Sequence, residues 1–555
     1  MPATTQDQSD VAVGEKRIES RGLTATEEAP EANEATDEET TAYLDGWALW
    51  SLTVALTSSA FMLSLDNTIL ATAIPRITSD FNSLNDIGWY ASAYRITQMA
   101  LLPTCGRIFT LYDVKWSYTI LLLVFEIGSV ICAIAQNSVT LIVGRAVSGI
   151  GAAGSMGGAA IIVSYCLPLV KRPVLMGFIS LVYGIGSILG PLVGGVFTDN
   201  ATLTWRFCFW INLPFGAIAL AQIWYTLRKP PPAVKAGLPP REKIRQLDLP
   251  GATVLIASVV CLMLALQWGG IVYPWSDAKV YGCFIGFGLL LTLFVWIQIK
   301  DQNSCTVPLH LFRNRTVCAS TGFMLFLQLA VAVQAYYWPI YFQSVKDTSA
   351  RDSGIYMFPF AISSTVCTLA CGWIVSKVGY YVPFMWIGTP ILAVGVALFQ
   401  FLDLHSHASR WVGYQIITGI GFGVCGQVPI VAVQAVSSKE NTPTVVVLVL
   451  FFESLGGALA TSIAQNVFTD SLLRGLGKIN GVDGAAVVEA GVKDFRRLIP
   501  SQLLDQVVRV FGDAMRNVFW SALASLVVAL LISIAMEWRK LSDVIQEGDA
   551  GVESA

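Results

Sequence analysis

Long apolar runs separated by short polar breaks dominate the chain between residues 46 and 537. Each run is about 20 residues long, the length that a helix needs to cross a hydrocarbon layer of about 30 Å. Lipid, rather than a water-excluding core, is therefore the solvent for most of the chain. We predict an all-α, polytopic membrane protein with fourteen spanning helices, near residues 46–72, 86–104, 117–136, 138–166, 174–197, 206–227, 250–268, 280–299, 317–342, 354–375, 382–402, 411–436, 443–467 and 517–537.

The even number of spans puts both termini on one side of the membrane. Lys and Arg are concentrated in the tails and short loops of that side, with a basic, Pro-rich cluster at 228–247. By the positive-inside rule that side is the cytoplasm. The long stretch 468–516 on the outer side also holds seven Lys or Arg, but the rule is counted over short loops. We expect a multi-pass plasma-membrane protein with both termini cytoplasmic; a vacuolar or vesicle membrane is the alternative.

The same pattern divides the chain into segments. We expect a disordered, acidic cytoplasmic tail at 1–45, because that stretch is polar and has no apolar core to be cleaved as a signal peptide. A cytoplasmic linker at 228–249 separates a six-helix half (46–227) from an eight-helix remainder, and its second part could form a helix on the membrane surface. A cytoplasmic tail at 538–555 ends the chain.

Composition excludes several classes of protein. The chain is 54% hydrophobic and 13% charged, whereas soluble domains carry about 25% charged residues. The net charge of -3 indicates no nucleic-acid partner, and there is no Gly-x-x-x-x-Gly-Lys-Ser/Thr stretch for an ATP-driven pump. Cys367 and Cys371 share a helix but have no His or carboxylate beside them, so we expect no metal and no cofactor. With three histidines, none inside a span, we expect no enzyme activity.

Five ionisable residues lie inside predicted spans, where each costs at least about 2.5–3.5 kcal/mol to insert. Burial favours the protonated form of a carboxyl group, and a buried arginine stays charged and can pair with it. Such a group can load and release a proton, so we predict proton coupling; a permanent structural ion pair is the alternative. The candidates are Asp66, Arg145, Glu126, Glu453 and Arg95.

Glycine and proline mark the fifth span. A side-chain-free stripe at every fourth residue lets another helix approach closely in lipid, and a proline permits a kink. Taken alone, such a stripe is also typical of simple packing. The residues are Gly184, Gly186, Gly190, Pro191, Gly194 and Gly195.

Several sequence blocks together resemble the major facilitator superfamily, and specifically its fourteen-helix drug:proton antiporter branch of fungal toxin and multidrug exporters. They are Leu65-Asp66-Asn67-Thr68-Ile69 with Pro75, Arg145-x-x-x-Gly149-x-Gly151, the Gly184 to Gly195 pattern, Trp205-Arg206-x-x-Phe209-x-Ile211-Asn212-x-Pro214, and Tyr337-x-Pro339-x-Tyr341-Phe342-Gln343 with Ser353-Gly354 and Pro359. The resemblance implies that Asp66 and Arg145 act in proton transfer and that the fifth-span pattern belongs to exporters.

The resemblance also implies two six-helix bundles, at 46–227 and 300–537, with two inserted helices at 250–299. The usual inner gate loop is represented here by Gly106, Arg107, Asp113 and Lys115, but Thr110 replaces its acidic residue. A weak echo, Gly372-x-x-x-Ser376-Lys377-x-Gly379, occurs in the second half, as expected of a repeated fold.

The implied function is export of small amphipathic organic molecules (a toxin, secondary metabolite or drug) in exchange for protons by alternating access. We expect a monomer in the lipid bilayer. Polar and aromatic side chains that could line the substrate cavity are Gln334, Tyr336, Tyr337, Gln427 and Gln434. Two alternatives stay open: a proton-coupled importer of a siderophore or nutrient, and a non-transporting membrane receptor. Asn200-Ala201-Thr202 is a glycosylation sequon, although an Asn so close to the bilayer could stay unmodified.

Overall fold

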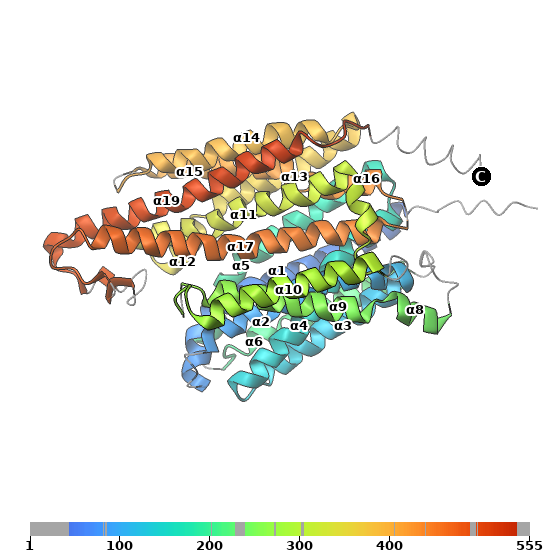
Figure 1. Ribbon diagram of the computed structural model, residues 1–555, viewed down its shortest axis with the longest axis horizontal. Helices are drawn as coiled ribbons and strands as arrows, with labels where there is room; N and C mark the ends of the chain where they lie inside the picture. The colour runs from blue at the N-terminus through green and yellow to red at the C-terminus, as the bar shows by residue number, and fades with distance from the viewer. Residues whose placement is uncertain are drawn as a thin grey trace, which may run out of the picture. The chain divides into compact units, whose positions relative to one another are not determined.

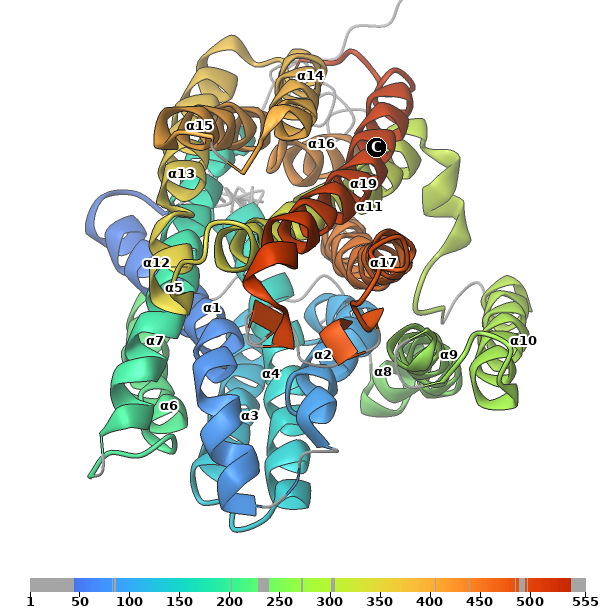
Figure 2. The same ribbon diagram turned by 90° about the vertical axis from the view of Figure 1, so that its left-hand side faces the viewer.

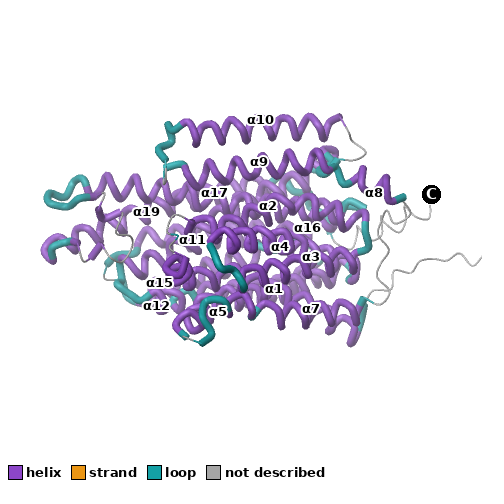
Figure 3. The backbone as a smooth tube through the Cα atoms, turned by 90° about the horizontal axis from the view of Figure 1, so that it is seen from below, coloured by secondary structure: helices purple, strands orange, loops and turns teal. Residues whose placement is uncertain are grey.

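The computed structural model describes residues 44–540, except residues 82, 84, 85, 201, 228–238, 271, 272, 301–304, 405, 439, 485, 489–494 and 497. The described residues are almost all helical and form no named β-strand (Figure 3). The tails predicted at 1–45 and 538–555 lie outside the described residues, apart from a few residues at their inner ends, and so does the first part of the linker.

Three groups of helices follow one another along the chain. The N-terminal half consists of α1 (Gly46–Phe81), α2 (Ile87–Leu111), α3 (Val114–Ala133), α4 (Ser138–Cys166), α5 (Arg172–Asp199), α6 (Phe207–Trp210) and α7 (Asn212–Thr226). The middle group is α8 (Pro240–Gln246), α9 (Leu249–Trp268) and α10 (Ala278–Lys300). The C-terminal half consists of α11 (Arg315–Ser344), α12 (Ala350–Ile355), α13 (Phe358–Val378), α14 (Val382–Leu398), α15 (Ala408–Cys425), α16 (Val428–Val436), α17 (Thr442–Leu476) and α19 (Ser501–Ser533).

Every predicted span coincides with helix. In the part of the chain that the structure describes, 13 helices are long and apolar enough to cross a membrane. The remaining predicted span, 86–104, coincides with α2, a 25-residue helix whose polar residues dilute its hydropathy.

Three predicted spans are each interrupted. The span at 206–227 is divided into α6 and α7 at Ile211, and the span at 354–375 into α12 and α13. The span at 411–436 breaks between α15 and α16 just before Pro429, in the first turn of α16. Because proline has no backbone N–H to donate to the preceding turn, a helix tends to begin there rather than continue through it.

The long outer loop predicted at 468–516 is wrong in its extent. Helix α17 continues to Leu476 and α19 begins at Ser501, so helix occupies much of this stretch. With 35 residues at 1.5 Å each, α17 is about 52 Å long, which exceeds the bilayer core of about 30 Å. Both helices project beyond their neighbours at one end of the molecule (Figure 1). Hydropathy locates the apolar part of such a helix and misses its polar extension.

The two halves form separate bundles that meet along two seams. We call the side on which α1, α5, α11 and α17 begin the terminal face, and the side on which they end the opposite face. Helix α2 packs against α17 at one seam, and α5 packs against α13 at the other. Helices α9 and α10 lie outside both bundles beside the α2–α17 seam (Figure 2). An apolar cluster that includes Met99, Val259 and Leu448 holds α9 there.

Candidate functional site

A fully buried ion pair lies inside the N-terminal half. Arg145 Nη1 on α4 is 2.6 Å from Asp66 Oδ2 on α1, and the two side chains are 1% and 0% exposed. Arg145 Nε donates to the carbonyl oxygen of Tyr90 at 3.1 Å, and the guanidinium stacks over the ring of Tyr94 at 4.4 Å. The structure therefore brings together the two residues to which the sequence assigns proton transfer, with Asp66 held as the partner of a charged arginine.

Burying these two charged side chains costs free energy, because both lose their contacts with water. Only a short ion pair with additional hydrogen bonds can compensate for that loss. Here the carboxylate of Asp66 accepts hydrogen bonds on both oxygens, and Arg145 donates through two nitrogens. Removing either partner would leave an uncompensated charge. Protonation of Asp66 would neutralise the carboxylate and leave Arg145 without its ionic partner.

Asn212, at the start of α7, is the residue that sequence reasoning missed. Its Nδ2 donates to Asp66 Oδ1 at 3.0 Å and to Ser129 Oγ on α3 at 3.1 Å, and the side chain is fully buried. The signal was present, because Asn212 stands in the Trp205 to Pro214 block. That block suggested a family but no role, and nothing in it indicated that Asn212 would face the first helix.

Glu126, on α3, lies in the same buried region. Both of its carboxyl oxygens are buried, and neither has a hydrogen-bond partner among the described residues. The carboxyl group packs against Gly216 on α7, where an added Cβ would overlap it. Glu126 is therefore a neighbour of the Asp66 pair rather than an isolated side chain in lipid.

The remaining two predicted proton-coupling residues lie apart from this pair. Glu453, on α17 in the C-terminal half, is partly buried and lines the cavity between the halves. Arg95, on α2, is exposed and lies close enough to Tyr183 to interact with it electrostatically. The five residues thus form a buried cluster of three, Asp66, Arg145 and Glu126, and a second pair, Arg95 and Glu453, both of which interact electrostatically with Tyr183 on the cavity wall.

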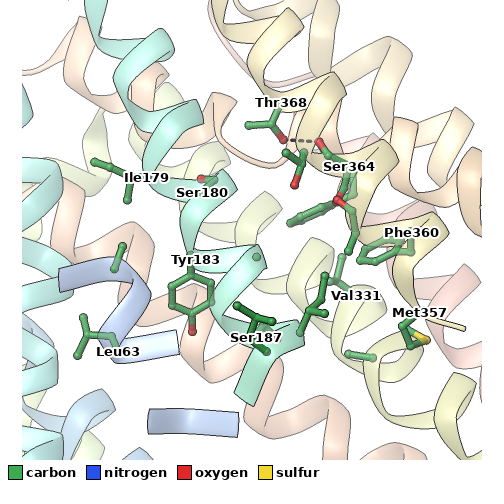
Figure 4. Close-up of a pocket in the computed structure, with 18 of the residues that line it drawn as sticks. Leu63, Ile179, Ser180, Tyr183, Ser187, Val331, Met357, Phe360, Ser364 and Thr368 are labelled. Atoms are coloured by element: carbon green, nitrogen blue, oxygen red, sulfur yellow. Dashed lines mark hydrogen bonds between the residues drawn. The ribbon is translucent and has the colours of Figure 1, made fainter. Parts of the chain in front are cut away.

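A cavity of about 1240 Å³ lies between the two halves. Its walls come from α1, α4 and α5 on one side and from α11, α12, α13, α15, α16 and α17 on the other. Figure 4 shows Ile179, Ser180, Tyr183 and Ser187 on α5 facing Ser364 and Phe360 on α13. The wall is largely apolar, with hydroxyl, amide, thioether and aromatic groups set among aliphatic residues, and Glu453 is the one charged side chain among the described lining residues.

The predicted cavity lining needs correction. Gln427 lies on the wall as expected, but the other four residues do not. Gln334 and Tyr337 are buried inside the C-terminal half, where Tyr337 packs on Phe468. Tyr336 is exposed away from the cavity. Gln434 instead joins the halves, donating to the carbonyl oxygen of Ala160 at 3.4 Å. The periodicity of hydrophobic residues does not predict which face of a wholly apolar helix turns toward a cavity.

The glycine–proline pattern of α5 has two faces. Gly186, Gly190 and Gly194 pack against α1 between Phe61 and Thr72, where an added Cβ would meet backbone or side-chain atoms of α1. Gly184, Pro191 and Gly195 line the cavity instead. The stripe therefore lets α5 lie directly against the helix that carries Asp66.

The predicted inner gate loop lies at the terminal face. A Cβ on Gly106 would lie 3.3 Å from Val447 Cβ and 3.4 Å from the carbonyl oxygen of Pro443, at the start of α17. Arg107 is buried and donates from Nε and Nη2 to the carbonyl oxygen of Gln246 at the end of α8.

The other residues of that loop have local roles. Asp113 accepts from the backbone N–H of Trp116 and so caps the start of α3. Lys115 stacks over the ring of Trp224 at 4.3 Å. Thr110 donates within its own helix to the carbonyl oxygen of Gly106. No acidic side chain of this loop therefore bonds across the seam in the described structure.

The corresponding glycine of the second half makes an equivalent contact. A Cβ on Gly372 would lie 2.6 Å from the carbonyl oxygen of Pro173, at the start of α5. Each motif glycine thus meets the proline that opens the fifth helix of the other half. These contacts hold the halves together at the terminal face, while the cavity wall continues to Val196 and Gly354 near the opposite face.

The sequon residue Asn200 follows the last residue of α5. Its Oδ1 accepts from the backbone N–H groups of Thr202 and Leu203, and the residue is exposed. Glycosylation there stays a prediction.

Comparison with known proteins places this geometry in context. The family model described as "Major Facilitator Superfamily" matches residues 56–461. The chain is 55% identical over 518 residues to the MFS-type transporter ltbE of Aspergillus luteorubrus, covering 93% of this chain and 95% of the relative. It is 38% identical over 505 residues to the efflux pump aflT of Aspergillus parasiticus, covering 91% and 98%.

Solved structures show the same fold at low identity. The proton:xylose symporter XylE, bound to 6-bromo-6-deoxy-D-glucose, has a TM-score of 0.58 at 13% identity and covers 89% of this chain and 98% of its own. The human organic anion transporter MFSD10 has a TM-score of 0.57 at 13% identity, covering 88% and 100%. At such identity the similarity concerns the fold alone.

Proposed function

Because the chain belongs to the Major Facilitator Superfamily, we propose that it exports small amphipathic organic molecules in exchange for protons, by alternating access. The observation that carries the proposal is a cavity whose walls come from both halves, next to a fully buried Asp66–Arg145 pair inside one of them. A binding space and a chargeable switch are the two parts that such an exchanger requires.

The cavity suits a partly apolar cargo. Pockets for drug-sized ligands are about 300–1,000 Å³, and this one, at about 1240 Å³, can hold a larger molecule or one with its bound water. Its hydroxyl and amide groups can orient a ligand while Phe360, Phe422 and Met357 contact apolar surface. Fungal relatives are named efflux pumps, which favours a toxin, secondary metabolite or drug as cargo and outward transport.

Alternating access would use the two seams. In the structure the halves touch at the terminal face through the Gly106 and Gly372 contacts, and the cavity extends toward the opposite face. With the terminal face cytoplasmic, as the distribution of Lys and Arg favours, this is the outward-facing conformation. Rocking the halves would break the two glycine contacts and expose the cavity to the cytoplasm.

Proton coupling would act on the ion pair. While Asp66 is ionised, Arg145 and Asn212 hold it. A proton arriving from outside would neutralise Asp66 and release Arg145, and that change in buried charge would favour the other conformation. The proton gradient would then supply the energy for export across the plasma membrane by a monomer.

The first test is Asp66→Asn, which keeps the shape of the side chain and removes its charge change. We expect the variant to fold and insert but to lose gradient-driven export, measured in vesicles after a pH jump with a panel of dyes and toxins. Asp513→Asn, an exposed acid on α19 paired with Arg516, is the control and should export normally. Unchanged export by Asp66→Asn would remove Asp66 from the mechanism, and export that survives collapse of both pH and voltage gradients would make the carrier passive.

A further inference from the structure

Three buried oxygens beside the Asp66–Arg145 pair have no hydrogen-bond donor among the described residues. Asn212 donates through Nδ2, but its Oδ1 is buried and accepts nothing; both carboxyl oxygens of Glu126 are also buried and unbonded. A buried polar atom without a partner costs free energy, and a buried charge without one costs far more. The three atoms therefore call for a common explanation.

The two residues lie on facing turns of α3 and α7. Ser129, which accepts from Asn212 Nδ2, is one turn after Glu126 on α3. Gly216, which packs on the Glu126 carboxyl group, is one turn after Asn212 on α7. Because residues three or four apart share one face of a helix, Glu126 and Asn212 face the same narrow space between α3 and α7. The missing side chain of Gly216 makes room for the carboxyl group.

We propose that Glu126 carries a proton in this conformation and donates it to Asn212 Oδ1, so that Asn212 links a neutral acid to the ionised Asp66. The proposal rests on the proposed proton coupling and deepens it, since it makes Asn212 and Glu126 positioning residues of the switch. One proton then supplies the donor that Asn212 Oδ1 lacks. The amide in turn donates to Asp66 through Nδ2.

Charge balance supports this arrangement. In the described structure, the titratable side chains that interact with Asp66, Glu126 and Arg145 come from five helices, and Arg145 is the one cation among them: Asp66 on α1, Tyr94 on α2, Cys132 on α3, Arg145 on α4 and Cys208 on α6. A further cation, the exposed Arg95, interacts with Tyr94. One arginine neutralises one carboxylate. A second ionised acid beside Asp66 would be a like charge in a buried pocket with no donor for it among the described residues, whereas the neutral acid of Glu126 has neither penalty.

The link also explains how Asp66 is held for Arg145. The carboxylate of Asp66 accepts from Arg145 on one oxygen and from Asn212 on the other. Hydrogen bonds in a chain polarise one another, so the donor from Glu126 strengthens the Asn212 N–H as a donor to Asp66. Loss of the proton from Glu126 would weaken the hydrogen bond from Asn212 to Asp66. The protonation of Glu126 would thereby influence the protonation of Asp66.

The decisive experiment is infrared difference spectroscopy on the purified full-length protein in lipid nanodiscs at neutral pH, without cargo or gradient. Wild type minus Glu126→Gln should show the C=O stretch of one protonated carboxyl group. In Asn212→Leu that band should shift to higher frequency, because the acid has lost its acceptor. Asp470→Asn, an exposed acid on α17 paired with Arg474, should leave the band unchanged. A difference spectrum with a carboxylate band instead would overturn the proposal.

A second readout separates positioning from mere packing. Gln at position 126 keeps an N–H donor for Asn212, whereas Leu keeps only the volume. We expect export by Glu126→Gln to be about tenfold faster than by Glu126→Leu, the rate change that one hydrogen bond to a charged network is worth, with the difference in kcat rather than KM. Equal rates would refute the link even if Glu126 is protonated. Because the infrared result needs no transport, it stands or falls separately from proton-driven export.

Discussion

The two halves of the molecule bury different chemistry at corresponding positions. The first and fourth helices of the N-terminal half carry Asp66 and Arg145, which pair at 2.6 Å. The first and fourth spans of the C-terminal half carry Gln334 on α11 and Gln415 on α15, and both amides are buried without hydrogen-bond partners among the described residues. The buried ion pair is thus confined to the N-terminal half, while the C-terminal half contributes Glu453 to a cavity wall that is drawn from both halves.

The difference between the halves reflects the free-energy cost of burying a neutral amide and of burying a charge. An unpaired neutral amide costs about 1–3 kcal/mol when buried, which a large membrane protein can absorb. A lone buried charge costs several kcal/mol more, so Asp66 and Arg145 occur together and with Asn212 beside them. If protons drive the transporter, its N-terminal half holds the charge switch and its C-terminal half moves against it.

The largest effect is expected from breaking the charged pair on one side only. Arg145→Leu leaves the Asp66 carboxylate uncompensated and should lower the free energy of unfolding by about 3–5 kcal/mol, measured by thermal unfolding in detergent. Arg474→Leu, which removes an exposed arginine paired with Asp470, should change it by less than about 1 kcal/mol.

A double variant makes the first half resemble the second. Asp66→Asn with Arg145→Gln should recover most of the stability lost in Arg145→Leu, because no charge remains buried, and should still fail to export against a gradient. Full export by this variant would show that the halves differ in composition but not in role.

The next effect compares the two glycine contacts of the terminal face. Gly372→Ala places a methyl group 2.6 Å from a backbone oxygen of Pro173, whereas the methyl group of Gly106→Ala meets Val447 and Pro443 at 3.3 and 3.4 Å. Overpacking costs about 1–3 kcal/mol, so Gly372→Ala should destabilise the conformation seen here more than Gly106→Ala does.

The measurement uses Val196→Cys, a substitution on the cavity wall. A membrane-impermeant thiol reagent is added from the side of the opposite face, and the labelling of this cysteine reports how far the cavity is open to that side. Its labelling should fall most in Gly372→Ala, less in Gly106→Ala, and not at all in Gly413→Ala, where nothing lies within 4 Å. Equal labelling in all three would mean that these glycines do not hold the gate.

The smallest effect is expected inside the C-terminal half. Gln415→Leu removes an unbonded amide at nearly constant volume, so stability should stay the same or rise by about 1 kcal/mol, measured by the same thermal unfolding assay. A marked loss of stability would show that the amide of Gln415 is satisfied by bound water.

Much of the fold followed from the sequence because lipid imposes a simple rule on length and polarity. The fourteen predicted spans all coincide with helix, including α2, whose polar residues hide it from a strict hydropathy criterion. The polar extensions of α17 and α19 were missed, since no apolar residues mark them. Asp66 and Arg145 could be named because ionisable residues in a span are rare and expensive.

The sequence by itself therefore determined which segments span the membrane, which charged residues lie inside the spans and which small residues permit close packing. Only the tertiary structure decided the partners. It put Asn212 against Asp66, Gly372 against Pro173 and Gln434 against Ala160, and it left Gln334 and Tyr337 off the cavity wall. The physical reason is that a helix apolar on every side has no face marked by polarity, so the packing of its neighbours decides which side meets the cavity.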